Sequence, residues 1–129
     1  MIVLDASVVV DLLLGTPPAA RVEARIGRDR SLHAPAVLDL EVAQAVRRVC
    51  TTGQVPVWRG DGVIADLGML PVRRYPHTPL LPRIWSLRGN LSSYDAAYIA
   101  LAEALRAPLL TRDRRLAAAR GHAAVVEVV

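Results

Sequence analysis

Along this chain, short runs of apolar residues alternate with longer segments whose apolar positions recur every three or four residues. The short runs are typical of buried strands, and the longer segments are typical of helices with one apolar side. The predicted strands span residues 1–5, 31–35, 71–76, 107–111 and 124–129. The predicted helices span residues 7–15, 18–28, 36–53, 55–70, 79–87, 92–106 and 113–120, and glycines weaken the helical pattern of the fourth. Strands that alternate with helices predict an α/β fold, in which helices cover both faces of a parallel sheet.

The composition agrees with one compact fold. The chain has 129 residues, of which 53% are hydrophobic, so it can bury a core and differs from a disordered chain. No internal repeat or low-complexity tract divides it. We therefore expect one domain over residues 1–129.

Charge and cysteine content narrow the class of protein. All sixteen basic residues are arginines and the net charge is +4, which favours acidic partners such as nucleic acid, although a GC-rich genome also explains the absence of lysine. Cys50 is the single cysteine, so no internal disulfide forms. The apolar N-terminal segment contains Asp5 and Asp11 and lacks a basic start, so it resembles neither a signal peptide nor a membrane span. These features predict a soluble, cytoplasmic protein.

Four acidic residues lie where predicted strands end or predicted helices begin. Asp5 and Asp113 come at the ends of strands 1–5 and 107–111, and Glu41 and Asp95 lie early in helices 36–53 and 92–106. Each has an ordinary structural interpretation as well. Asp5 and Asp113 can cap helices, Asp95 can form a capping box with Ser92, and Glu41 can belong to a solvated helix face.

Taken together, these four carboxylates favour a cation site. Sites in parallel sheets form beside the carboxyl ends of the strands, where the four side chains can converge. Carboxylates brought close together repel one another unless a cation compensates them, and hard oxygen ligands favour Mg²⁺ or Mn²⁺ over zinc. His33, His77 and His122 are far apart and show no zinc-ligand spacing. The phosphate-binding and nucleophile motifs rich in glycine are absent.

Four segments resemble, in order and spacing, the PIN-domain ribonucleases, and among these the VapC-type toxins of bacterial toxin–antitoxin pairs. The segments are "MIVLDASVVVDLLL", "APAVLDLEVAQAVRR", "LSSYDAAYIALAEAL" and "APLLTRDRRLAAA". The resemblance covers nearly the whole chain, is most specific in the last two segments and is poor over residues 53–90. It implies a three-layer α/β/α sandwich with a central parallel sheet, and cleavage of RNA with Mg²⁺ or Mn²⁺.

The resemblance also implies the roles of particular residues. Four carboxylates match the catalytic metal site of the family and two hydroxyl residues match its supports. These are Asp5, Glu41, Asp95 and Asp113, and then Ser7 and Thr111. Arg112, Arg114 and Arg115 surround the last carboxylate, and we expect them to hold RNA phosphates; the alternative is that they pair with acidic groups of the surface or of a partner.

Partners follow from the same resemblance. Family members are commonly homodimers and are held inactive by a cognate antitoxin, so a VapB-type antitoxin and a second copy of the chain are expected. The apolar helices 7–15 and 36–50 offer a groove for an antitoxin segment, unless their apolar faces lie wholly inside the core.

Two other functions compete with an endoribonuclease toxin. One is a housekeeping PIN nuclease in RNA maturation, and the other is a PIN-like binding module without catalysis. A phospho-accepting regulatory module needs a paired acidic set and a lysine partner, and the absence of lysine from this chain argues strongly against it.

Overall fold

The computed structural model describes residues 1–129 and contains a five-stranded sheet with the strand order β3-β2-β1-β4-β5. All neighbouring strands are parallel. The strands are β1 (Ile2–Leu4), β2 (Leu32–Pro35), β3 (Val72–Tyr75), β4 (Leu109–Thr111) and β5 (Val126–Val128). Each lies within a strand predicted from the sequence, which confirms the central parallel sheet.

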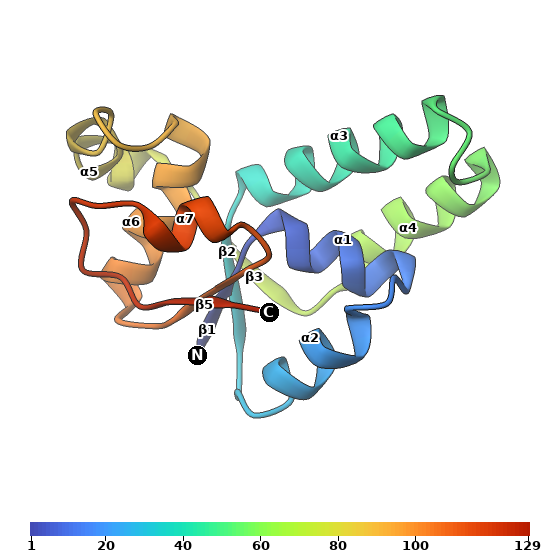
Figure 1. Ribbon diagram of the computed structural model, residues 1–129, viewed down its shortest axis with the longest axis horizontal. Coiled ribbons are helices and arrows are strands. Elements are labelled where there is room, and N and C mark those ends of the chain that lie inside the picture. The colour runs from blue at the N-terminus through green and yellow to red at the C-terminus, as the bar shows by residue number, and fades with distance from the viewer.

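Helices cover both faces of this sheet (Figure 1). One side carries α1 (Ala6–Leu14), α2 (Ala19–Ile26), α3 (Val37–Thr51) and α4 (Val57–Met69). The other side carries α5 (Leu81–Ser86), preceded by the short 3-10 helix η1 (Thr78–Leu80), then α6 (Ser93–Leu105) and α7 (Arg114–Ala118). The three-layer α/β/α sandwich expected from the sequence is therefore confirmed.

The core forms where β1 and α6 meet. All three residues of β1 are fully buried, because it lies at the centre of the sheet with helices on both faces. Helix α6 is buried over seven consecutive residues, Ala96–Ala102. A helix that is apolar all round is stable in water only when other elements enclose it, which fixes its position over the centre of the sheet.

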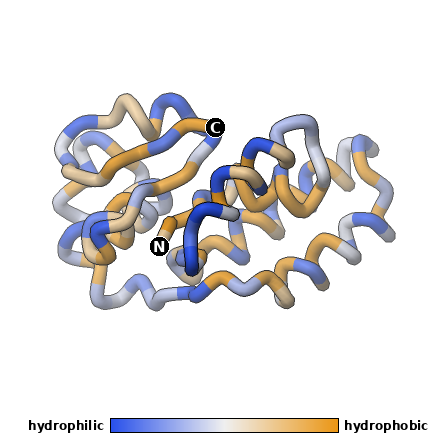
Figure 2. The backbone as a smooth tube through the Cα atoms, turned by 90° about the horizontal axis from the view of Figure 1, so that it is seen from below, coloured by the Kyte–Doolittle hydropathy of each residue, from blue (hydrophilic) through white to orange (hydrophobic).

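Helices α3 and α4 form an antiparallel pair that extends furthest from the sheet (Figures 1 and 2). Hydrophobic and hydrophilic segments alternate along both helices in Figure 2, as expected of a pair that buries only its inner side. Arg74 of β3 secures the base of the pair: it donates hydrogen bonds to the carbonyls of Leu67 and Leu70 and forms an ion pair with Asp39. None of the helices combines the length and the apolar character needed to cross a lipid bilayer.

Candidate active site

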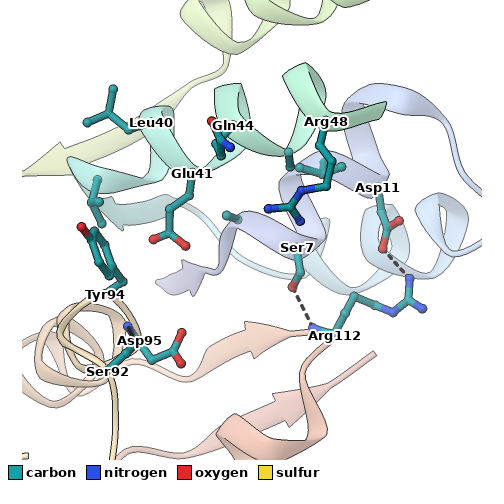
Figure 3. A pocket seen from close by; sticks show the side chains of 14 residues that line it. Ser7, Asp11, Leu40, Glu41, Gln44, Arg48, Ser92, Tyr94, Asp95 and Arg112 are labelled. Carbon is teal, nitrogen blue, oxygen red and sulfur yellow. Dashed lines mark hydrogen bonds and ion pairs between the residues drawn. The ribbon is translucent and has the colours of Figure 1, made fainter. Parts of the chain in front are cut away.

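A groove of about 890 Å³ opens beside the carboxyl ends of β1 and β4. Its walls come from the start of α1, the inner side of α3 and the start of α6 (Figure 3). The charged side chains that line it are Asp11, Glu41, Arg48, Asp95 and Arg112. The groove therefore brings together two of the four predicted carboxylates, and a third, Asp5, lies at its base, one residue before the lining residue Ala6.

Asp5 is buried at the end of β1 and is held by two hydroxyl groups. The Ser7 and Thr111 hydroxyls donate to its Oδ2 atom at 2.6 Å and 2.7 Å. Both bonds go to the same oxygen, which leaves Oδ1 for another partner. Asp5 is the N-cap residue of α1, as predicted, but its side chain forms no capping bond, so helix capping does not account for the carboxylate.

The same two hydroxyls connect Asp5 to the segment that follows β4. Ser7 Oγ accepts the backbone N–H of Arg112 at 3.0 Å, and Thr111 Oγ1 accepts that of Asp113 at 3.0 Å. Each hydroxyl thus donates to the carboxylate and accepts a backbone N–H, which lies 105 residues further along the chain for Ser7 and two residues further for Thr111. A hydroxyl can do both at once, which is why Ser and Thr suit these positions.

Glu41 projects from the inner side of α3 toward the groove (Figure 3). Its Oε1 atom and the hydroxyl of the neighbouring Tyr98 are both buried, and neither forms a hydrogen bond of ordinary geometry. Burial raises the pKa of Glu41 and the negative charges of Asp5 and Asp95 add to this effect, while the nearby Tyr98 hydroxyl acts in the opposite direction. The interpretation of Glu41 as part of a solvated helix face is therefore wrong.

Asp95 faces Glu41 from the first turn of α6, across the groove (Figure 3). Its backbone N–H donates to Ser92 Oγ at 3.2 Å, so the Ser92 half of the predicted capping box is present. Burial and the charge of Asp5 raise the pKa of the Asp95 carboxyl group. The Asp95 carboxylate thus lines the groove, where burial and a neighbouring negative charge disfavour its ionised form.

Asp113 lies at the edge of this group and does not line the groove. Its carboxylate caps α7 by accepting the backbone N–H of Arg115 at 2.8 Å, as the structural interpretation predicted. Burial opposes its ionisation, but the N–H and guanidinium groups of Arg115 outweigh burial and lower its pKa. Its negative charge nevertheless contributes to the raised pKa of Asp95, which places the two carboxylates near each other.

The three predicted phosphate-binding arginines differ in their surroundings. Arg112 lines the groove, and its guanidinium forms an ion pair with Asp11 of α1 (Figure 3). Arg115 is 93% exposed and pairs with Asp113 at 3.4 Å. Arg114 forms no ion pair and faces a neighbouring hollow.

Sequence reasoning did not single out Asp11, Gln44, Arg48 or Tyr94 as residues of the site. All four line the groove, and Arg48 extends from α3 toward α1 without an ion pair (Figure 3). One signal was available for Asp11, which is the only charge within an apolar helix. The other three are polar or aromatic residues on mixed helices, and nothing in their local sequence distinguishes them.

The donor set of the groove fits a hard divalent cation. A buried carboxylate oxygen without a partner and three mutually repelling carboxylates are both relieved by a positive ion with oxygen ligands. No three acidic, histidine or cysteine side chains already form a compact ligand group. The carboxylates therefore face the same space without having closed around it.

The parallel sheet and the groove with carboxylates at its carboxyl edge define an α/β protein with an acidic site. The sequence profile of the family described as "PIN domain" matches residues 2–121. The chain belongs to the PIN-domain family, and within it to the VapC-type toxins.

Two relatives from Mycobacterium tuberculosis are similar over almost their full lengths. Ribonuclease VapC12 is 44% identical over 129 residues, which is 100% of this chain and 99% of the relative. Ribonuclease VapC1 is 41% identical over 128 residues, which is 98% of this chain and 96% of the relative.

Solved structures share the fold at low sequence identity. PAE2754 from Pyrobaculum aerophilum has a TM-score of 0.74 and 22% identity, covering 98% of this chain and 83% of its own. VapC20 of Mycobacterium tuberculosis, described as a sarcin–ricin loop cleaving toxin, has a TM-score of 0.73 and 15% identity, covering 97% and 98%. VapBC2 from Rickettsia felis has a TM-score of 0.70 and 13% identity, covering 99% and 98%.

Proposed function

We propose that this chain is a metal-dependent endoribonuclease and the toxin of a toxin–antitoxin pair. The observation that carries the proposal is the groove in which Glu41 and Asp95 face each other above the buried Asp5, with raised pKa values for the first two. The names of the full-length relatives support RNA as the substrate. The net charge of +4 also favours a polyanionic substrate.

Asp5, Glu41, Asp95 and Asp113 are the residues that hold Mg²⁺ or Mn²⁺ in this proposal. The bound ion supplies Lewis-acid activation of water and of the phosphodiester. Ser7 and Thr111 hold the Asp5 carboxylate in place through Oδ2, so that binding of an ion through Oδ1 costs little further side-chain freedom.

Hydrolysis in this site adds the oxygen of water to phosphorus and breaks the bond from phosphorus to the 3′ oxygen. The products are a 5′-phosphate and a 3′-hydroxyl. The carboxylates would repel an RNA phosphate on their own, and Arg48, which carries no ion pair, supplies a positive charge from α3, two turns beyond Glu41.

The decisive experiment incubates the purified chain with total cellular RNA in Mg²⁺, in Mn²⁺ and in EDTA, and maps the cut ends by sequencing. We expect discrete cuts that require metal, and a rate reduced about 100-fold or more by Asp95→Asn or Glu41→Gln. Asp66→Asn is the matched control, because Asp66 is exposed on α4 and lines none of the groove.

Cutting by Asp95→Asn at the rate of the unaltered protein would show that the site is assigned wrongly. Folded protein that leaves all RNA intact in both metals would contradict the nuclease, and would favour a PIN-like module that binds without catalysis.

We also propose that the groove receives a segment of a VapB-type antitoxin. Between α1 and α3 it is lined by apolar side chains of both helices, and its acidic end at Glu41 and Asp95 suits a basic side chain. Several structural neighbours are described as toxin–antitoxin assemblies. Co-expression with a cognate VapB-type antitoxin should give a stable complex in which RNA cutting is suppressed.

A further inference from the structure

A second hollow lies next to the groove and shares one residue with it. This hollow, which we call the arginine hollow, has a volume of about 640 Å³ and is lined by Arg21, Arg112, Arg114, Ala117, Ala118, Val128 and Val129. Arg112 lines both spaces, so the arginine hollow lies directly beside the acidic groove. We propose that it binds a phosphate of the same RNA strand, next to the phosphate that is cut; this rests on the proposed ribonuclease function.

Three elements that are distant in the sequence build the arginine hollow. Arg21 comes from α2 on one side of the sheet, and Arg114 comes from the start of α7 on the other. Both line the same hollow as Val128 and Val129, which lie at the carboxyl end of the edge strand β5. The hollow therefore sits at the same edge of the sheet as the groove, because all the strands are parallel.

The charges in the arginine hollow are not neutralised by the protein. Neither Arg21 nor Arg114 forms an ion pair with an acidic side chain. No acidic side chain lines the hollow. Only Arg112 is paired, with Asp11, and that pair together with the Ser7 hydrogen bond to its backbone holds it at the boundary between the two spaces.

Two unpaired guanidinium groups facing one hollow repel each other, and an anion between them removes that repulsion. A guanidinium matches the oxygens of a phosphate with two parallel hydrogen bonds, which makes arginine the typical residue for such a site. A single strand that passes through the acidic groove continues past Arg112 into this hollow. The arginines thus compensate the repulsion that the carboxylates exert on the same strand.

This inference separates the three arginines that follow β4. Arg112 and Arg114 line the arginine hollow, whereas Arg115 lines neither space and points into solvent beside Asp113. Arg21, which the sequence did not single out, takes the place that Arg115 was expected to have.

The test measures binding of a fluorescein-labelled, single-stranded RNA 12-mer of random sequence by fluorescence anisotropy, in EDTA so that no cutting occurs. We expect Arg21→Gln and Arg114→Gln each to weaken binding about tenfold at low salt, and to reduce the dependence of log affinity on log salt by about 0.7. Arg30→Gln is the matched control: it removes the same charge, is exposed and unpaired, and precedes the amino end of β2 at the opposite edge of the sheet. Binding by the control should stay within twofold of the unaltered protein.

Equal weakening by all three substitutions would overturn the proposal, because only net charge would then matter. Unchanged binding by Arg21→Gln and Arg114→Gln would also overturn it. The same variants are also compared for RNA cutting in Mn²⁺. Cutting that persists while both variants bind like the control would refute the arginine hollow and leave the nuclease intact. Selective loss of binding in a protein that never cuts RNA would support the hollow and refute the nuclease.

Discussion

Glu41 is a proposed metal ligand whose position in the fold disfavours its ionised form when no cation is bound. Its position on α3 buries one carboxylate oxygen without a partner, and two other carboxylates lie near enough to raise its pKa. A group whose pKa is higher in the folded protein stabilises the fold at low pH, and that contribution disappears as the pH rises through the folded pKa. At neutral pH, without a cation, the ionised Glu41 therefore destabilises the fold.

We predict that Glu41→Gln raises the melting temperature in EDTA at pH 7.5 by about 2–6 °C and has no effect near pH 3.5, where Glu41 is protonated in both states. Added Mn²⁺ should raise the melting temperature of the unaltered protein and have little effect on Glu41→Gln. Differential scanning fluorimetry measures both effects. Glu23→Gln, an exposed residue of α2, is the control. Equal stabilisation of both proteins by Mn²⁺ would argue against Glu41 as a ligand.

At the scale of elements, the contact between α3 and α4 depends on one small residue. A Cβ atom at Gly60 would lie 2.6 Å from Cys50 Sγ and 3.4 Å from Val46 Cγ1, so only glycine permits this approach. Gly62, one half-turn further along α4, faces open space. The glycines that weakened the helical pattern of this segment therefore have different structural roles.

We predict that Gly60→Ala lowers the free energy of unfolding by about 1–2 kcal/mol through overpacking. Gly62→Ala should raise it by about 0.5–1 kcal/mol, because alanine restricts the unfolded chain and favours the helix. Urea unfolding measures both, and since both changes gain helix propensity, their difference isolates the contact with Cys50. Stabilisation of similar size by both substitutions would mean that α3 and α4 do not approach this closely.

At the scale of the whole molecule, large apolar side chains remain on the surface of the side formed by α5 and α6. Leu81 is 47% exposed, Trp85 is 66% exposed and Tyr94 is 62% exposed. Leu81 and Tyr94 line one shallow hollow with Val37 and Ile84, so these side chains form a connected apolar surface. Connected apolar surfaces of this kind mark sites of association.

We predict that the chain is a homodimer through this surface, with a molar mass in solution of twice 13.9 kDa. Leu81→Glu should convert it to a monomer, because an ionised carboxylate in an apolar interface loses its hydration without gaining a partner. Size-exclusion chromatography with light scattering distinguishes the two states. Met69→Glu, at an 84% exposed position on α4, serves as the control and should remain dimeric. A monomeric unaltered chain would refute this expectation.

The sequence by itself determined the element order, the parallel sheet and its helical layers. Local periodicity indicates which side of each helix or strand is apolar. Because helices and strands alternate along the chain, few arrangements bury all the apolar sides together. The sequence also placed Asp5 and Asp113 at strand ends and Glu41 and Asp95 early in helices, and the resemblance to the family matched all four to one metal site. These properties depend on neighbours along the chain, or on short motifs.

Only the tertiary structure decided how the side chains meet. Three features depend on elements that are distant in the sequence: the burial of Glu41, the ion pair between Arg112 and Asp11, and the hollow that Arg21 and Arg114 both line. Asp113 likewise caps α7, as one interpretation of the sequence predicted, and its charge also acts on Asp95, which no local pattern indicated. The distances between such groups determine their pKa values and which charges are paired. Folding sets these distances when the parallel sheet brings the carboxyl ends of its strands to one edge.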